Sequence, residues 1–140
     1  MTFPIFLGFL GTIPLIFSSL LTFLLISDNI IIIKIALSYS AVILSFLGAV
    51  HWGYLIKIDL SPRIHSYQWI WSVSGSLLGW ISLVFLIFDK IIFCSLVLFF
   101  GFTVSLVIDL KIFSQIMWYR KLRIYLSFIA ILNIIFLGLI

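Results

Sequence analysis

The side chains best suited to chemistry are a histidine, an aspartate and two arginines near the ends of apolar segments. His51 stands six residues before Lys57, which in a helix places its imidazole roughly 9 Å deeper than that lysine. Asp109 ends a later apolar segment, and Arg120 and Arg123 begin the next one. An ionisable group inside an apolar span is costly and is a functional candidate by default. The candidate polar cluster comprises His51, Trp52, Asp109, Trp118, Tyr119, Arg120 and Arg123.

Several interpretations of His51 stay open. We favour a structural imidazole that hydrogen-bonds a serine, a backbone carbonyl or Asp109. A second interpretation is a polar pocket for a lipid headgroup, a quinone or a small anion, and a proton relay is a third. A bis-histidine haem site would need a second histidine at matching depth, but His65 stands in a loop between Pro62 and Tyr67. We therefore expect no metal site and no cofactor.

Asp109 and the two arginines each sit at an unfavourable helix end. Asp109 is an anion at a helix C-terminus, and Arg123 is a cation near a helix N-terminus. Each opposes the helix dipole by about 0.3–1 kcal/mol, and placing them together offsets both penalties. We predict that Asp109 pairs with Arg123 or with Arg120. The alternative is that the arginines only anchor the helix to anionic lipid.

The elements that position these groups are membrane spans. The chain has 140 residues, of which 65% are hydrophobic and 9% charged, whereas a soluble domain carries about 25% charged residues. A helical span needs about 20 apolar residues. We therefore predict an all-α membrane protein whose residues 1–140 form a single polytopic domain, a five-transmembrane-helix bundle. Its helices are expected at about residues 3–26, 33–56, 69–88, 91–108 and 122–140.

The positive charges are distributed unevenly between the two ends of this bundle. Lys34 and Lys90 flank one end, and the other six of the eight basic residues flank the other. Basic loops stay in the cytoplasm or the mitochondrial matrix, so we expect the N-terminus inside and the C-terminus outside. The expected location is a bacterial or mitochondrial inner membrane. The basic residues at the predicted inner end are Lys57, Arg63, Lys111, Arg120, Lys121 and Arg123.

Small residues recur at helical spacing in the second and third spans. Helices in lipid associate through close backbone approach, which such residues permit. We expect these two rows to meet within the chain; the alternative is a homodimer or partner interface. In the first span, Gly8, Gly11 and Pro14 allow a close contact or a kink. The two rows are Ser38, Ala41, Ser45 and Gly48, and Ser72, Gly75, Ser76 and Gly79.

Familiar catalytic patterns are missing from the sequence. There is no His-Glu-x-x-His, Gly-x-Ser-x-Gly or phosphate-binding glycine loop, and all four acids are aspartates. Cys94 is the only cysteine and Asn133 is expected to donate an interhelical hydrogen bond. The net charge of +4 follows from topology, so no nucleic-acid partner is expected. These absences argue against an enzyme without excluding one.

One string of residues is specific enough to suggest a family. Ile43-Leu44-Ser45-Phe46-Leu47-Gly48 is followed by His51-Trp52-Gly53, and further matches extend from Leu7 to Arg123. The chain resembles the membrane proteins grouped as domain of unknown function 3429, the transmembrane protein 69-like small membrane proteins. Gly75 and Met117 stand where that pattern often has proline. The resemblance implies an inner-membrane protein and supplies no activity.

Two functions fit these observations. The first is a non-enzymatic accessory or assembly component of a membrane complex, which binds a protein partner or a second copy within the lipid bilayer. The alternative is a binder or carrier for a quinone, a lipid headgroup or an anion that uses the polar cluster at the inner end. The second function predicts a cavity beside His51.

Overall fold

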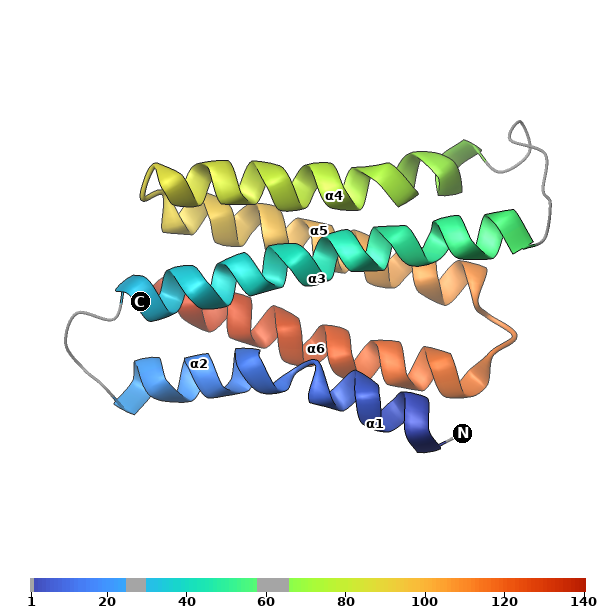
Figure 1. Cartoon of the computed structure of the whole chain (residues 1–140), viewed down its shortest axis with the longest axis horizontal. Helices are drawn as coiled ribbons and strands as arrows, with labels where there is room; N and C mark the ends of the chain where they lie inside the picture. Colours follow the sequence, from blue (N-terminus) through green and yellow to red (C-terminus); the bar gives the residue numbers. More distant parts are fainter. Residues whose placement is uncertain (1, 25–29, 58–65) are drawn as a thin grey trace.

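The computed structural model describes residues 2–24, 30–57 and 66–140, and every regular element among them is a helix (Figure 1). Five stretches are long and apolar enough to cross a membrane, and α1 and α2 together make the first of them, Phe3–Leu24. The predicted five-span helical membrane fold is therefore confirmed. The helices are α1 Thr2–Leu10, α2 Ile13–Leu24, α3 Ile30–Lys57, α4 Ser66–Ile87, α5 Ile91–Ile112 and α6 Met117–Leu139.

Several helices extend beyond the bounds expected from the sequence. α5 continues past residue 108 to Ile112, and α6 begins at Met117 rather than near residue 122. The sequence argument ended spans at charged residues, but a charge does not stop the backbone ladder: Phe113 N still donates to Asp109 O at 2.9 Å. Two of those charges are instead paired inside the bundle. Residues 25 and 26 of the first expected span lie outside the described residues.

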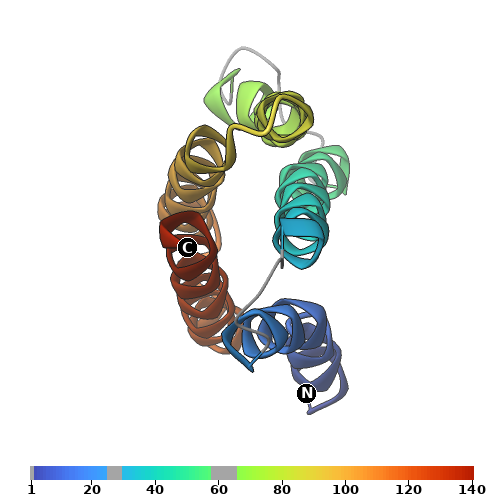
Figure 2. The same cartoon turned by 90° about the vertical axis from the view of Figure 1, so that its left-hand side faces the viewer.

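The bundle is a ring of helices around a shared core. α4, α5, α6, α2 and α3 follow one another around it, and α3 also contacts α5 and α6 across the middle (Figure 2). α1 lies at the margin, against α6. Leu37, Leu44, Leu98, Phe102 and Ile134 fill the interior and are almost completely buried. α3 and α6 therefore each contact four of the other helices.

The rows of small residues on α3 and α4 meet face to face. A Cβ atom on Gly48 would lie 2.9 Å from Ser72 O, and one on Gly79 would lie 2.8 Å from Ala41 O. The two backbones are thus in direct contact, which is how helices associate in lipid. Ser76 is the exception, since it lies on the exposed face of α4. These rows are used within the chain.

The first span is broken at Gly11 and Thr12, which form a turn between α1 and α2. Thr12 Oγ1 donates to Phe9 O at 2.8 Å, and the hydroxyl of Tyr39 on α3 donates to Gly11 O at 2.8 Å. Pro14 lies in the first turn of α2, where its missing N–H costs nothing. Side chains thereby compensate for the lost helical hydrogen bonds of the break.

α4 and α5 form a tight helical hairpin. Lys90 N donates to Phe85 O at 2.9 Å and Asp89 N donates to Leu86 O at 3.2 Å. This is the paired bonding of a Schellman helix end, whose turning residue is left-handed. Asp89 occupies that position with φ of 56°. Lys34 Nζ lies 2.5 Å from Asp89 Oδ1 and ties the hairpin to the start of α3.

Candidate functional site

Three helices contribute to a buried polar cluster at one end of the bundle. Asp109 on α5 accepts a hydrogen bond from Arg123 Nε on α6 through Oδ2. Its other oxygen, Oδ1, lies 2.9 Å from Nε2 of His51 on α3. Arg123 Nη2 also donates to Ser105 Oγ at 3.1 Å. The side chains of His51, Asp109 and Arg123 are 0%, 2% and 6% exposed, so the carboxylate is enclosed between an imidazole and a guanidinium.

The sequence folds locally so as to bring these groups together. Ser105 and Asp109 are four residues apart on α5 and therefore share one face of that helix. Both face α6, where Arg123 lies one and a half turns or so from the helix start, at roughly 9 Å from Met117. Of the two arginines that the sequence offered to Asp109, the structure pairs Arg123. Ser105 was missed by the sequence argument, although its spacing from Asp109 was a usable signal.

The formal charges within the cluster cancel between Asp109 and Arg123. Asp109 and Arg123 carry opposite formal charges, so their pair adds no net charge to the buried site. The His51 Nε2 and Asp109 Oδ1 atoms are close, yet neither atom has a hydrogen-bond partner among the described residues. Nδ1 of His51 has no hydrogen-bond partner among the described residues. The imidazole therefore lies beside the ion pair, but the ion pair does not satisfy the hydrogen-bonding capacity of its ring nitrogens.

Aromatic rings cover the imidazole on the side of the nearer membrane boundary. The Phe113 ring centroid lies 5.8 Å from that of His51. Tyr54 and Tyr119 pack edge-on against Phe113, at 5.0 Å and 4.9 Å, and Trp118 packs edge-on against Tyr119 at 5.9 Å. The side chain of His51 is completely buried beneath these rings. The site around His51 is closed.

Two members of the candidate cluster lie apart from it. Trp52 is 44% exposed and packs edge-on against Trp69 at 5.3 Å, outside the bundle core. Arg120 donates to Ser114 O at 3.4 Å and makes no contact with Asp109. The structure thus divides the predicted cluster into a buried centre, an aromatic cover and two peripheral residues. Arg63 and His65 lie outside the described residues.

Asn133 takes part in a second interhelical contact, near the other end of α6. Ser19 on α2 donates to Asn133 Oδ1, and Asn133 Nδ2 donates to Ile129 O of its own helix at 2.7 Å. The sequence argument expected Asn133 to donate between helices, but it accepts instead. The serine hydroxyl can rotate to donate, whereas the amide N–H group is engaged along α6.

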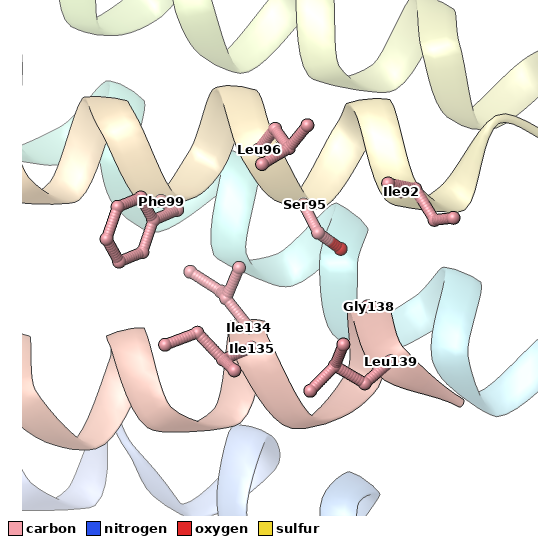
Figure 3. Close-up of a pocket in the computed structure, with 8 residues that line it drawn as sticks. All are labelled: Ile92, Ser95, Leu96, Phe99, Ile134, Ile135, Gly138 and Leu139. Atoms are coloured by element: carbon pink, nitrogen blue, oxygen red, sulfur yellow. The ribbon is translucent and has the colours of Figure 1, made fainter.

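A cavity of about 170 Å³ lies beside Arg123 where the first span is broken. It is bounded by α1, α2, α3, α5 and α6, and its lining is mainly apolar. A second hollow of about 280 Å³ lies between α5 and α6 at the opposite end, around Ser95 and Gly138 (Figure 3). Among the described residues, no three histidine, cysteine or acidic side chains are grouped so as to hold a metal ion.

Five spans held together by small-residue packing and an enclosed ion pair define a polytopic integral membrane protein. The chain belongs to the family described as proteins of unknown function (DUF3429), whose model matches residues 2–139. It is similar to transmembrane protein 69 of Xenopus tropicalis, with 27% identity over 132 residues and 94% of this chain. That stretch is 51% of the relative, so the chain spans about half of its length. No solved structure matches the chain.

Proposed function

We propose that the protein is a non-enzymatic accessory or assembly component of a complex in an inner membrane, where it binds a transmembrane helix of another protein. The buried centre supports this function because His51 and Asp109 are enclosed within the bundle and Asp109 is paired with Arg123. A reaction would require an open site for substrate. The cluster instead holds α3, α5 and α6 together inside the bundle.

The observation that carries the proposal is a shallow groove on the outer face of α4, with a volume of about 500 Å³. Ile70, Val73, Ser74 and Leu77 line it at i, i+3, i+4 and i+7 spacing, so they form one continuous helix face. Trp52 and Trp69 also line it. A helix that packs into such a groove would gain van der Waals contacts, which drive association in lipid.

The groove is positioned to receive a helix that crosses the same leaflet. It starts near the α4 end that adjoins the cluster and runs toward the middle of the span. Ser74 places a small side chain between Ile70 and Leu77, and its hydroxyl donates to Ile70 O at 2.8 Å. Because that hydroxyl is satisfied within α4, the groove floor is compatible with an apolar partner surface.

Site-specific crosslinking in native membranes tests the proposal. A photoreactive residue replaces Leu77 in the groove, and the matched control replaces Leu132 on α6, which has a similar exposed fraction (55% and 49%). We expect one protein to crosslink in stoichiometric amount from position 77 and not from position 132. Val73→Trp, which fills the groove, should lower the yield at least tenfold, whereas Val107→Trp on α5 should not.

Three results would contradict the proposal. The first is a chain that migrates alone after mild extraction and gives no crosslink from position 77. The second is the same crosslinking pattern from positions 77 and 132, which would indicate random collision in the bilayer. The third is a crosslinked product that contains two copies of this chain, because the partner would then be the protein itself.

The alternative function, a carrier for a quinone, lipid headgroup or anion that uses the whole polar cluster, stays a prediction. It requires His51 to face a cavity that opens at the inner end. The enclosed position of His51 beneath Phe113 gives it no support. The cavity beside Arg123 is a separate feature that includes neither His51 nor Trp52.

A further inference from the structure

The cavity at the break between α1 and α2 has the features of a binding site. We propose that it binds one hydrophobic molecule from the bilayer through a carbonyl oxygen, which accepts hydrogen bonds from Arg123 and Ser127. This inference does not depend on the α4 groove or on a protein partner, because the two sites share no lining residue.

The first support is an unsatisfied hydroxyl. Ser127 lines the cavity and is only 1% exposed, yet its Oγ has no hydrogen-bond partner among the described residues. A buried hydroxyl without a partner is costly, and such groups are rare in folded proteins. The other serines within α3 and α4 that have hydrogen bonds donate to their own helices, as Ser40 and Ser45 do at 3.0 Å. Ser127 is thus free to donate to a ligand.

The second support is the guanidinium beside it. Arg123 and Ser127 are four residues apart on α6 and both line the cavity, so they face it from the same side of the helix. Arg123 uses Nε for Asp109 and Nη2 for Ser105, which leaves Nη1 without a partner among the described residues. Asp109 already balances its charge. A neutral acceptor such as a carbonyl oxygen therefore suits the site without adding an unpaired charge.

The size and lining of the cavity define the rest of the ligand. A cavity of 150 Å³ holds a benzene-sized molecule, so about 170 Å³ admits one substituted ring or a short ester-bearing segment. Leu15, Ile43, Leu47, Phe102 and Ala130 surround that volume with hydrocarbon. The remainder of a long molecule must extend outside. A single carbonyl-bearing end that enters an apolar pocket satisfies both conditions.

The cavity is accessible from the lipid phase. Leu7 on α1 and Phe46 on α3 line it and are 50% and 65% exposed, so its mouth lies between these helices. Along α6, Arg123 and Ala130 are roughly 9 Å and 20 Å from the helix start at Met117. The site is therefore deeper than the headgroups of one leaflet. A molecule dissolved in the bilayer reaches it more directly than one dissolved in water.

The hollow between α5 and α6 does not share this character. Ser95 is also without a hydrogen-bond partner there, but the other side chains around it are hydrocarbon and no cation is present (Figure 3). That hollow opens toward lipid, and an acyl chain can fill it without a specific polar contact. It serves as an internal comparison, because a probe that only dissolves among apolar side chains should label both places.

Photolabelling of the purified full chain in dodecyl maltoside, a detergent that has no carbonyl group, tests the proposal. One probe is a diazirine-bearing fatty-acid methyl ester, and the other is an azidobenzoquinone with a decyl tail. We expect saturable labelling of residues that line the cavity by at least one probe. Labelling by the ester alone would assign an acyl lipid, and labelling by the quinone alone would assign a quinone.

Two variants connect the labelling to the proposed contacts. Ser127→Ala should weaken binding by about two- to tenfold, as expected for one neutral hydrogen bond, without lowering the unfolding midpoint, because its hydroxyl has no partner in the protein. Ala130→Leu should abolish labelling by filling the cavity, and Ala130→Val repeats that test if the leucine variant does not fold. The controls Ser76→Ala and Ala49→Leu, at exposed positions, should change neither the labelling nor the unfolding midpoint.

Either of two results overturns the inference. One is that neither probe labels the cavity more strongly than the hollow around Ser95. The other is that labelling persists at full strength when Ala130 is enlarged in a folded variant.

Discussion

Nε2 of His51 on α3 lies 2.9 Å from Oδ1 of Asp109 on α5, and the opposite oxygen of that carboxylate bonds Arg123 on α6. One aspartate therefore joins three helices that are distant in the sequence. The contact lies toward the inner ends of the helices, as the positive-inside rule predicts them, where α5 and α6 are connected through the turn that contains Phe113 and Ile116. Because the charges are buried, their pairing fixes how these helix ends sit against one another.

Loss of Arg123 should be much more damaging than loss of the ion pair as a whole. Arg123→Leu leaves Asp109 as a buried anion, which costs about 3–5 kcal/mol of unfolding free energy. The double variant Asp109→Leu with Arg123→Leu removes both charges and should recover at least half of that loss. Unfolding by sodium dodecyl sulfate in bicelles measures both values. A double variant less stable than Arg123→Leu would show that the unpaired Asp109 carboxylate is not the cause of the loss.

The exposed ion pair at the other end of the bundle is the matched control. Lys34 and Asp89 have side chains that are 36% and 64% exposed. Exposed pairs contribute about 0–1 kcal/mol, so Lys34→Ala should change the unfolding free energy by less than 1 kcal/mol. An effect as large as that of Arg123→Leu would mean that burial is not what distinguishes the two pairs.

The contact between α3 and α4 should depend on the absence of a side chain at Gly79. A Cβ atom there would lie 2.7 Å from Ser45 Oγ and 2.8 Å from Ala41 O. We expect Gly79→Ala to cost about 1–3 kcal/mol through overpacking, measured by the same unfolding assay. Gly53→Ala is the control, because nothing lies within 4 Å of a Cβ atom at that position. Alanine is a better helix former than glycine, so this variant should raise the free energy of unfolding by about 0.5–1 kcal/mol. Equal effects at the two glycines would contradict the close packing.

The number of spans and the ion pair could be predicted because each depends on local chemistry. Long apolar runs must be helical in lipid. The sequence argument paired Asp109 with an arginine to offset opposed helix dipoles, but α6 begins six residues before Arg123, so burial of the two charges is the stronger reason for their pairing. The cavity beside Arg123 could not be predicted in this way. Ser127 and the turn at Gly11 and Thr12 line the same cavity, and their proximity depends on how α1, α2 and α6 pack together. Nothing in the spacing of residues along one helix encodes it.

The separation of Trp52 from His51 has a similar origin. The two residues are adjacent in the sequence, so side chains on a helix at that spacing point in different directions. His51 faces the interior and Trp52 faces outward toward Trp69. The sequence argument placed His51 and Trp52 in one polar cluster, but helical geometry assigns them to different surfaces. Arg120 and Arg123 are three residues apart and therefore lie near each other on α6, yet Arg120 donates to Ser114 O whereas Arg123 donates to Ser105 Oγ.

The α4–α5 hairpin should tolerate asparagine at position 89 and reject valine. Asp89 has φ of 56°, a conformation that asparagine adopts readily at helix ends. Asp89→Asn should lose only the exposed ion pair with Lys34, which lowers the free energy of unfolding by about 0–1 kcal/mol. Asp89→Val adds left-handed strain of about 1–2 kcal/mol. Unfolding free energies of the two variants provide the comparison, and a valine variant as stable as the asparagine variant would show that the turn changes its conformation.

The orientation of the chain can be determined with two single-cysteine variants. Lys90 and Lys121 are both exposed, and they flank opposite ends of the bundle. In a Cys94→Ser background, Lys90→Cys should react with an impermeant maleimide from outside intact cells, whereas Lys121→Cys should react only after permeabilisation. The physical reason is that basic residues near span ends are retained on the inner side. The opposite pattern would place the buried cluster, the α4 groove and the cavity beside Arg123 toward the outer leaflet, so a partner helix and a bilayer ligand would both have to approach from that side.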